Sequence, residues 1–354
     1  MNQSVYERLA TFLDQMPTGF PRTASGVEIR ILKRLFTEEE AALACHLTAW
    51  PEPVETIARR ANRPLREASD TLYEMSRKKL IARTDRPEGT MYMALQFVIG
   101  IWEYQVNNLN EWLIKDMNKY IPFLFEAMNR IKTRQLRTIP IGASLDSQNC
   151  VMPYENAGRL LERQRKILVA PCICRTEHAM IGEGCGKLRE ACLVFSSAAT
   201  FYEKNGIGRI INKEEALDIL HKAEKEGLVL QPSNAQRVLN ICLCCGDCCQ
   251  ILKSIKRQPK PAEFVHSNYY AAVRSENCVG CKICLDRCQM DAIRLNNDIS
   301  EIDLSRCIGC GLCVTTCTNQ AIDLIRKNEK DCYVPPADTT ETYMRIVQER
   351  GLLK

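Results

Sequence analysis

The sequence contains CVGCKICLDRC at residues 278–288 and CIGCGLCVTTC at residues 307–317. Each segment has the pattern C-x2-C-x2-C-x3-C. When the second segment is moved back by 29 residues, 8 of the 18 positions from Cys278 to Leu295 are identical in the two copies. The chain therefore contains a duplicated cysteine-rich unit, and each copy supplies four thiols.

This spacing suits iron–sulfur clusters. Three closely spaced thiolates can hold one [4Fe–4S] cube, and the fourth cysteine of the same segment is placed to reach a second cube. Gly280, Gly309 and Gly311 allow the chain to bend closely around a cube, because glycine has no Cβ. Zinc is the alternative metal, but zinc sites usually combine two C-x2-C pairs that lie well apart. The repeated pattern favours iron–sulfur clusters.

Residues 268–328 resemble the bacterial ferredoxin domain that carries two [4Fe–4S] clusters and has a βαββαβ fold. The resemblance implies that cluster one is bound by Cys278, Cys281, Cys284 and Cys317, and cluster two by Cys307, Cys310, Cys313 and Cys288. The family usually has proline after each fourth cysteine, whereas this chain has Gln289 and Thr318. Residues 292–295 and 321–324 have the alternating pattern of short strands.

The composition is that of a globular protein with many cysteines. The chain has 354 residues, 45% hydrophobic and 26% charged, with 20 cysteines and a formal net charge of +5. This length is enough for two or three domains. The first residues do not have the layout of an export signal, so disulfides are a poor explanation for the cysteines. The most apolar run, residues 91–102, is too short to cross a bilayer. We expect a cytoplasmic protein of a reducing, oxygen-poor cell.

The first 96 residues predict an arm followed by a small helical domain. Residues 1–35 contain short helical stretches between prolines and glycines, and we expect an arm that packs on another subunit. Thr37 and Glu40 predict a capping box that starts a helix ending near Leu47. Further helices are expected at residues 54–61 and 65–79, and strands at residues 80–83 and 91–95. This order resembles a winged helix-turn-helix over residues 36–96.

A winged helix implies either DNA binding or protein docking. Arg59, Arg60, Arg63 and Arg66 cluster at the turn, and residues 77–79 place three basic side chains at the end of the expected recognition helix. Residues 1–137 contain 20 Lys and Arg against 17 Asp and Glu, whereas DNA-binding domains usually have a stronger basic face. We therefore favour docking to a protein over DNA.

Residues 97–137 predict an amphipathic helical connector that contains Trp102 and Trp112. Its apolar face is expected to form core and a dimer interface, and a cofactor site is the less favoured alternative. Pro122 is expected to kink or divide the helix.

A second group of cysteines lies in residues 138–262, which predict a small α/β domain. Strands are expected at residues 167–170, 228–230 and 238–241, with a helix from Asn212 to about Glu226. Residues 242–255 predict a helix that would place three cysteines on one face. Ligands usually bind at the strand ends of an α/β sheet. The nine thiols are those of Cys172, Cys174, Cys185, Cys192, Cys242, Cys244, Cys245, Cys248 and Cys249.

These nine cysteines predict at least one additional metal centre. They can serve two four-ligand clusters, or one cluster and a redox-active pair, and the adjacent cysteines favour iron–sulfur over zinc. The alternative is that several are small buried apolar residues. Arg175 and His178 are candidates for binding a substrate anion or donating a proton, although His178 also suits a polar loop position. Cys45, Cys150 and Cys332 are isolated and are predicted not to be ligands.

Two further resemblances concern this region. Residues 244–246 are similar to the CCG element of heterodisulfide-reductase-type subunits, which bind unusual clusters, although the surrounding spacing differs. The elements PCICR, EGCG, EACLVF and CLCCGDCC, followed by the repeat, are similar over about residues 165–328 to anaerobe proteins described as 4Fe–4S binding proteins. This implies an anaerobic redox role without a particular substrate.

The whole pattern predicts an α+β multidomain protein with three candidate functions. The ferredoxin domain is expected at residues 263–328, after a hinge at residues 256–261, and a tail with a short helix at residues 329–354. The first function is electron transfer between two [4Fe–4S] clusters and the additional centre, in contact with a redox partner protein. The second is a reductase with catalysis at that centre. The third is a redox-sensing regulator. We also expect a homodimer or a subunit of a complex.

Overall fold

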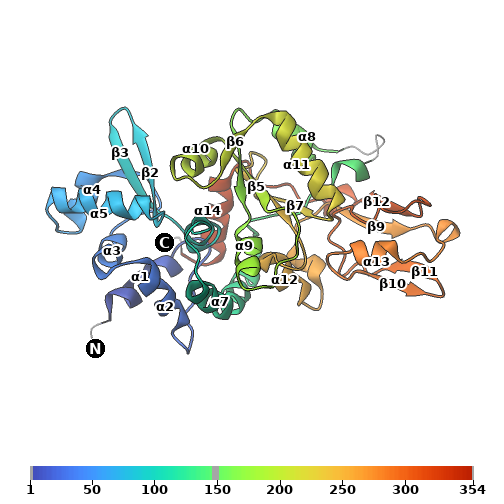
Figure 1. The fold of residues 1–354 in the computed structure, drawn as a ribbon, viewed down its shortest axis with the longest axis horizontal. Coiled ribbons are helices and arrows are strands. Elements are labelled where there is room, and N and C mark those ends of the chain that lie inside the picture. The colour runs from blue at the N-terminus through green and yellow to red at the C-terminus, as the bar shows by residue number, and fades with distance from the viewer. Residues whose placement is uncertain (1–2, 146–150, 353–354) are drawn as a thin grey trace. The chain divides into compact units, whose positions relative to one another are not determined.

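The computed structural model describes residues 3–145 and 151–352, and the chain divides into two compact units (Figure 1). Unit 1 contains residues 1–132, 201–207 and 346–354, and unit 2 contains residues 133–200 and 208–345. Both combine helices with small sheets, so the fold is α+β. Within the described ranges, no helix combines the length and the apolar character needed to cross a membrane. Finer domain boundaries stay a prediction.

Unit 1 begins with two amphipathic helices, α1 (Val5–Asp14) and α2 (Val27–Leu35). Helix α1 packs on α3 (Glu38–Ala44), and α2 packs on α7 (Glu111–Asn129). Leu9, Ile31 and Leu32 are fully buried in these contacts. Residues 5–35 therefore contribute to the core of unit 1, which differs from the separate arm expected from the sequence.

Residues 37–94 contain helices and a hairpin in the order expected from the sequence. Helix α3 begins at the capping box of Thr37 and Glu40. It is followed by β1 (Glu52–Pro53), α4 (Val54–Arg60), α5 (Leu65–Arg77), β2 (Ile81–Arg86) and β3 (Gly89–Ala94). The three strands form an antiparallel sheet in the order β1-β3-β2.

Residues 97–137 do not form one continuous helix. The short η1 (Phe97–Ile101) and α6 (Trp102–Tyr104) precede α7, which starts where the Asn110 side chain accepts a hydrogen bond from the N–H of Leu113. Helix α7 continues through Pro122, so of the two expected effects, a kink or a division, the proline does not divide the helix. Proline removes one backbone hydrogen bond, but Tyr120, Ile121 and Leu124 are buried beside it and stabilise the helix through their packing.

Unit 2 is built on a five-stranded sheet with the order β6-β4-β5-β8-β7. All neighbouring strands in it are antiparallel, so the middle of the chain is not the α/β arrangement expected from the sequence. The connections from β4 to β5, which contains α9, and from β7 to β8 return the chain beside the strand it has just left, whereas β6 pairs with β4. The strands are β4 (Ile167–Pro171), β5 (Glu190–Phe195), β6 (Arg209–Ile211), β7 (Val229–Pro232) and β8 (Asn240–Cys244).

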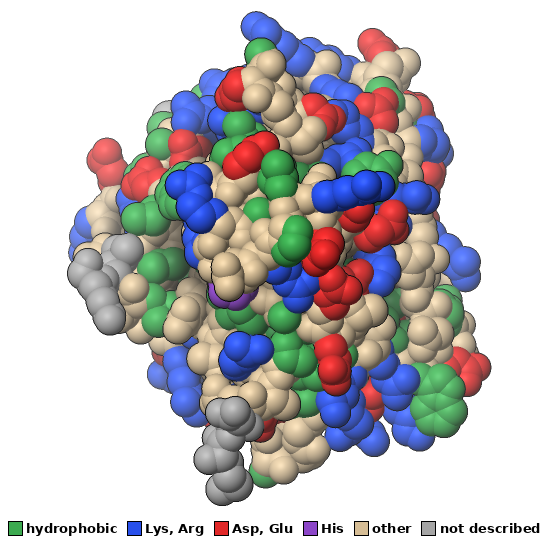
Figure 2. Space-filling model, turned by 90° about the vertical axis from the view of Figure 1, so that its left-hand side faces the viewer, with side chains coloured by type: hydrophobic (Ala, Val, Ile, Leu, Met, Phe, Trp, Pro, Cys, Tyr) green, Lys and Arg blue, Asp and Glu red, His purple; other side chains and the backbone are tan. Residues whose placement is uncertain are grey.

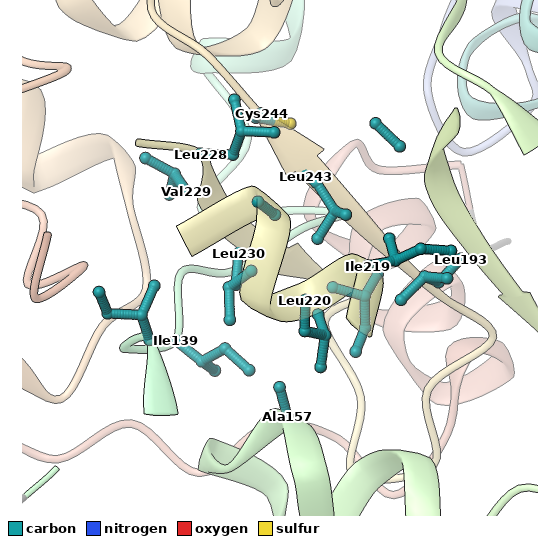
Figure 3. Packing of buried hydrophobic residues seen from close by; sticks show 14 of the residues in the cluster. Ile139, Ala157, Leu193, Ile219, Leu220, Leu228, Val229, Leu230, Leu243 and Cys244 are labelled. Atoms are coloured by element: carbon teal, nitrogen blue, oxygen red, sulfur yellow. The ribbon is translucent and has the colours of Figure 1, made fainter. Parts of the chain in front are cut away.

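The main core of unit 2 lies between this sheet and α11 (Lys213–Lys225). Ile219 and Leu220 of the helix lie among Leu193, Leu230 and Leu243 of the strands (Figure 3). As expected, Asn212 caps α11 by accepting from the N–H of Glu215. The other helices in this part are η2 (Gly142–Ser144), η3 (Pro153–Glu155), α8 (Ala157–Glu162), α9 (Ile173–Met180), α10 (Ser196–Lys204), α12 (Gln250–Lys256) and η4 (Pro261–Phe264).

The duplicated cysteine segments lie between the strands of two small two-stranded antiparallel sheets of unit 2. Strand β9 (Tyr269–Val273) pairs with β12 (Ile322–Arg326), and β10 (Ile293–Asn296) pairs with β11 (Ile299–Ile302). Strands β10 and β12 correspond to those expected at residues 292–295 and 321–324. The first copy contains α13 (Ile283–Arg287), whereas residues 311–316 of the second copy form turns. The short η5 (Ser275–Asn277), η6 (Glu329–Asp331) and α14 (Thr339–Glu349) complete the chain.

Candidate metal centres

Four thiols of the repeat surround one cavity. It is lined by Cys288, Cys307, Cys310 and Cys313, together with apolar side chains that include Ile308 and Leu312. These are the four cysteines that the ferredoxin resemblance assigns to cluster two. Four thiols around an apolar space are the donor set that a [4Fe–4S] cube requires, so the residues present fit this cofactor.

Burial disfavours the charged thiolate form in this cavity when no metal is bound. Burial raises the pKa of Cys310 to about 12 and also raises the pKa of Cys313. Thiolate is the form that binds iron, so metal binding must displace these protons. Positive charge from a bound metal would offset the cost of charged sulfur in this apolar space.

The other four cysteines of the repeat lie nearer the surface. Cys284 is buried, and this burial raises its pKa. Cys317 packs against the same small apolar cluster as Cys284. Cys281 is exposed, and the neighbouring Val279 has 65% of its surface exposed. This group, which we call the cluster-one group, is accessible from solvent.

Backbone N–H groups point at the sulfur atoms in both copies of the repeat. The N–H of Ala292 donates to Cys288 Sγ and that of Ala321 donates to Cys317 Sγ, each over 3.2 Å. Ala292 and Ala321 are equivalent positions, 29 residues apart. Such donors stabilise the charged form of sulfur, so the duplication preserves the electrostatic environment as well as the ligands.

Two glycines allow the cysteine loops to lie against neighbouring backbone. Gly309 has φ +66°, and a Cβ there would lie 2.1 Å from the carbonyl oxygen of Tyr269. Gly280, its equivalent in the first copy, has φ +66°, and its Cβ would lie 2.5 Å from the carbonyl oxygen of Asp298. Any other residue would push the loops away from the strands, as the sequence pattern predicts.

The nine cysteines of the middle region fall into two groups. The first, which we call the three-thiol group, contains Cys185, Cys245 and Cys248, whose sulfur atoms all lie within 4.8 Å of one another. Cys185 comes from the loop after α9, and the other two come from the turn between β8 and α12. Three converging thiols fit a metal ion or one face of an iron–sulfur cube.

The second, the six-thiol group, takes its cysteines from β5 and β8, from the start of α9 after β4 and from the start of α12. Cys192 and Cys242 are directly opposed on β5 and β8. Hydrogen bonds from Cys174 lower the pKa of Cys172 and of Cys249, and those from Cys192 and Cys244 lower the pKa of Cys242. The contacts form one continuous chain of thiols, in the order Cys172, Cys174, Cys249, Cys244, Cys242 and Cys192.

Helix starts contribute to the six-thiol group. Cys172 is the N-cap of α9 and Cys249 is the N-cap of α12. The nearby backbone amide of Arg175 contributes to the lowered pKa of Cys172, and those of Leu252 and Ile251 contribute to the lowered pKa of Cys249, although neither cysteine side chain forms a capping hydrogen bond. These amides have no partner within their helices, and they favour thiolate at both positions.

The helix expected over residues 242–255 is wrong in its first half. Residues 240–244 form strand β8, residues 246–248 form a turn, and α12 starts only at Gln250. The strand places Cys242 and Cys244 in the six-thiol group, while the turn directs Cys245 and Cys248 into the three-thiol group. The sequence thus identified the nine cysteines but not their division into the three-thiol group and the six-thiol group.

Arg175 lies beside both groups and is only 3% exposed. Its guanidinium donates to the carbonyl oxygens of Leu188 and Leu243 over 2.9 and 2.7 Å. Burial alone would lower its pKa, but the charges of Cys172, Cys245 and Cys244 raise it. Arg175 therefore stays positively charged and offsets negative charge on the surrounding sulfur atoms.

His178 is not a polar loop residue, because it is buried in α9. Its Nδ1 lies 2.8 Å from the carbonyl oxygen of Cys174, and its Nε2 lies 3.0 Å from Lys253 Nζ. The buried carboxylate of Glu177 raises its pKa and also accepts from Gln250 over 2.7 Å. Sequence reasoning missed Glu177, Gln250 and Lys253, since their contacts join segments about 75 residues apart.

The isolated cysteines lie apart from these groups. Cys45 contacts the carbonyl oxygen of Ala41, and Cys332 contacts that of Lys327. Cys150 lies outside the described residues.

Among the contacts that join the repeat to the middle region, one links the residues that follow two candidate ligands. The backbone N–H of Gly246 donates to Gln289 Oε1 over 2.6 Å. Gly246 follows Cys245 of the three-thiol group, and Gln289 follows Cys288 of the cavity. The only signal for this contact in the sequence was that Gln289 replaces the proline usual in the ferredoxin family.

Comparison with known proteins identifies one segment of the chain. Residues 277–321 match the family model described as a 4Fe-4S dicluster domain. Neither the curated proteins nor the solved structures contain a match to the chain. The matched residues include all eight cysteines of the repeat. This part of the chain is an iron–sulfur domain of the ferredoxin type.

Proposed function

We propose that this protein transfers electrons between two [4Fe–4S] clusters in residues 263–328 and a further cysteine-ligated iron–sulfur centre in residues 138–262. When bound, such clusters accept and donate single electrons at low potential. Cluster one would be held by Cys278, Cys281, Cys284 and Cys317, and cluster two by Cys288, Cys307, Cys310 and Cys313. The further centre would use the three-thiol group, the six-thiol group or both.

The observation that carries the proposal is the arrangement of thiols within one compact unit. Cys288 lines the cavity of four thiols and Cys245 belongs to the three-thiol group, yet the residues that follow them are hydrogen-bonded to each other. Arg175 then lies between the three-thiol and six-thiol groups. Separate sites with unrelated functions would not require contacts that connect one thiol group to the next.

The difference in solvent exposure between the two cysteine groups of the repeat supports one site for the entry of electrons. The cluster-one group has an exposed cysteine, and the nearby Val279 and Ile283 are 65% and 47% exposed. The cavity of cluster two is enclosed by apolar side chains. We therefore place the redox partner protein at the cluster-one group. The described cysteines are free thiols, consistent with a reducing compartment such as the cytoplasm of an anaerobe.

The winged-helix interpretation of residues 36–96 is supported by the order of α3, β1, α4, α5, β2 and β3. Three of its basic residues are paired with acids: Arg60 with Glu52, Arg63 with Glu39 over 2.8 Å, and Lys78 with Glu40 over 2.7 Å. Figure 2 shows positive and negative side chains intermixed on the face that it draws. Such a surface favours a protein partner or a second copy of the chain over DNA.

Exposed apolar side chains support the same interpretation. Trp50, Leu65 and Tyr73 belong to this region and are 61%, 50% and 45% exposed. Aromatic side chains are enriched at the core of protein interfaces.

A reductase with catalysis in the middle region is the second candidate. Among the described residues, the three-thiol group has three cysteine ligands, and a cube requires a fourth ligand at its remaining iron. That iron would be open to a small molecule. An EPR signal that does not shift with any candidate substrate would count against this function. A redox-sensing regulator is the third candidate.

Electron counting tests the proposal. Anaerobic titration with dithionite should deliver about three or more electrons per chain, because two ferredoxin-type clusters accept one each and the middle centre accepts the rest. A protein that takes up two electrons has only the ferredoxin clusters. One that takes up none is not an electron-transfer protein.

A further inference from the structure

The strongest unassigned feature of unit 2 is the contact between Gln289 and Gly246. Gln289 follows a cysteine of the cavity directly, and Gly246 follows a cysteine of the three-thiol group directly. The hydrogen bond between them is 2.6 Å long. The path from Cys288 to Cys245 therefore consists of two peptide links, the Gln289 side chain and this one hydrogen bond. Electron tunnelling passes more efficiently through bonds and hydrogen bonds than across gaps.

Glycine at position 246 is required by the closeness of the two loops. A Cβ there would lie 2.8 Å from the carbonyl oxygen of Gln289 and 3.2 Å from its side-chain oxygen. Any side chain would move the loops apart or break the hydrogen bond. The residues at both positions therefore allow the two backbones to approach. Proline at position 289 would have no side-chain acceptor for the N–H of Gly246.

The segment that carries Gln289 is held on both sides. Arg287 donates to the carbonyl oxygens of Lys225 and Glu224, so the residue before Cys288 is attached to the end of α11. Asp291 forms an ion pair with Lys256 over 2.8 Å. Arg306 donates to the carbonyl oxygen of Met290 over 3.0 Å and to that of Lys256 over 3.1 Å. These contacts keep Gln289 in place against the turn at Gly246.

The equivalent position in the second copy of the repeat has no such role. Thr318 is exposed, and its hydroxyl contacts only the neighbouring Asn319 side chain among the hydrogen bonds of the described residues. The two copies share their ligands and their N–H···S hydrogen bonds, but only the first copy contacts the middle region at this position. The asymmetry points to a function specific to the Cys288 side.

We propose that Gln289 and Gly246 form the electron bridge between the ferredoxin clusters and the middle centre, with Gln289 as the positioning residue. The inference rests on the proposed function. In the step, one centre loses one electron and the other gains it, and no bond forms or breaks. The external reductant is the redox partner, replaced by dithionite in the test. A purely structural contact would instead only hold the repeat against the middle region.

The test compares four purified, anaerobic full-length variants with the wild type. Q289L removes the acceptor, Q289E keeps a side-chain oxygen there, and G246A separates the loops. T318L places the same replacement at the equivalent position of the second copy. After rapid mixing with dithionite, freeze-quench EPR follows the signals of the ferredoxin clusters and the middle centre over time. Iron content and midpoint potentials are measured on the same samples.

We expect Q289L and G246A to keep the wild-type iron content and potentials but to slow reduction of the middle centre severalfold, since tunnelling weakens as the path between the centres lengthens. Q289E and T318L should have the wild-type rate. Wild-type rates in both Q289L and G246A would overturn the bridge. Loss of iron in both would also overturn it, because the contact would then only build the site. A wild-type protein without iron in the middle region contradicts the proposed function itself.

Discussion

The sulfur atoms of Cys185 and Cys245 lie 3.9 Å apart, although the residues are separated by 60 positions in the chain. Together with Cys248, they form a site that can hold metal without a large rearrangement. C185S and C248S should therefore lower the iron content of the anaerobic protein and remove one EPR signal, while the ferredoxin signals remain. Serine is a much weaker ligand for iron than cysteine thiolate.

The matched controls are C45S and C332S, which alter cysteines that contact only backbone carbonyl oxygens in their own segments. Both should keep the wild-type iron content. An unchanged iron content in C185S and C248S would show that the three-thiol group is not a metal site.

The thiols of the repeat should differ in reactivity after iron is removed by a chelator. Hydrogen bonds from the backbone N–H groups of Ser300 and Gly280 lower the pKa of Cys278, whereas burial raises that of Cys310 to about 12. A thiol with a lower pKa forms thiolate at lower pH. Alkylation of Cys278 should therefore reach its maximum rate at a lower pH than alkylation of Cys310, as measured by mass spectrometry. Equal pH profiles would contradict the cavity described above.

Glu155 should be important for the stability of unit 2. Its side chain is 4% exposed and lies 2.6 Å from Arg326 Nη1, and it also accepts from Asn268 over 2.6 Å. E155A would leave these donors without their acceptor and should cost about 3–5 kcal/mol, as for other broken buried ion pairs. The readout is the denaturant midpoint under anaerobic conditions.

The control for this change is E126A, which removes the exposed partner of Arg130 on α7. That pair is separated by 2.6 Å as well, but its side chains are 76% and 65% exposed, so the loss should be about 0.5 kcal/mol or less. If both variants shift the midpoint equally, Glu155 does not hold the segment before α8 against β12.

Binding of DNA by residues 36–96 should be weak. Arg60, Arg63 and Lys78 are paired with acidic side chains, which reduces the charge available for phosphate contacts. Random duplex DNA at micromolar protein should give no salt-sensitive shift in gel retardation. A complex that dissociates as salt is raised, and that R66A and R77A weaken, would favour the regulator over protein docking.

The repeat was predictable from sequence because its structure is local. The ligands of each motif lie within eleven residues of one another, and glycine is needed where the backbone touches a strand. The helix caps at Thr37 and Asn212 were predictable for the same reason, since a cap depends on residues three positions apart. The matched segment of 277–321 supports the iron–sulfur interpretation.

The middle region was less predictable because its contacts are distant in the chain. Cys185 meets Cys245 only after the antiparallel sheet has formed, and the pairing of β5 with β8 decides that Cys192 faces Cys242. The spacing of residues 245–249 is compatible with both a helix and a turn, and tertiary contacts selected the turn. Pro122 shows the same effect, since buried neighbours hold α7 together across it.

The most direct test of the central claim is to count iron and acid-labile sulfide in protein purified without air. Two [4Fe–4S] clusters contribute about eight irons per chain, and the account predicts more than this number, with EPR signals beyond those of a two-cluster ferredoxin after reduction. Zinc in place of iron, or fewer than about eight irons per chain, would contradict it.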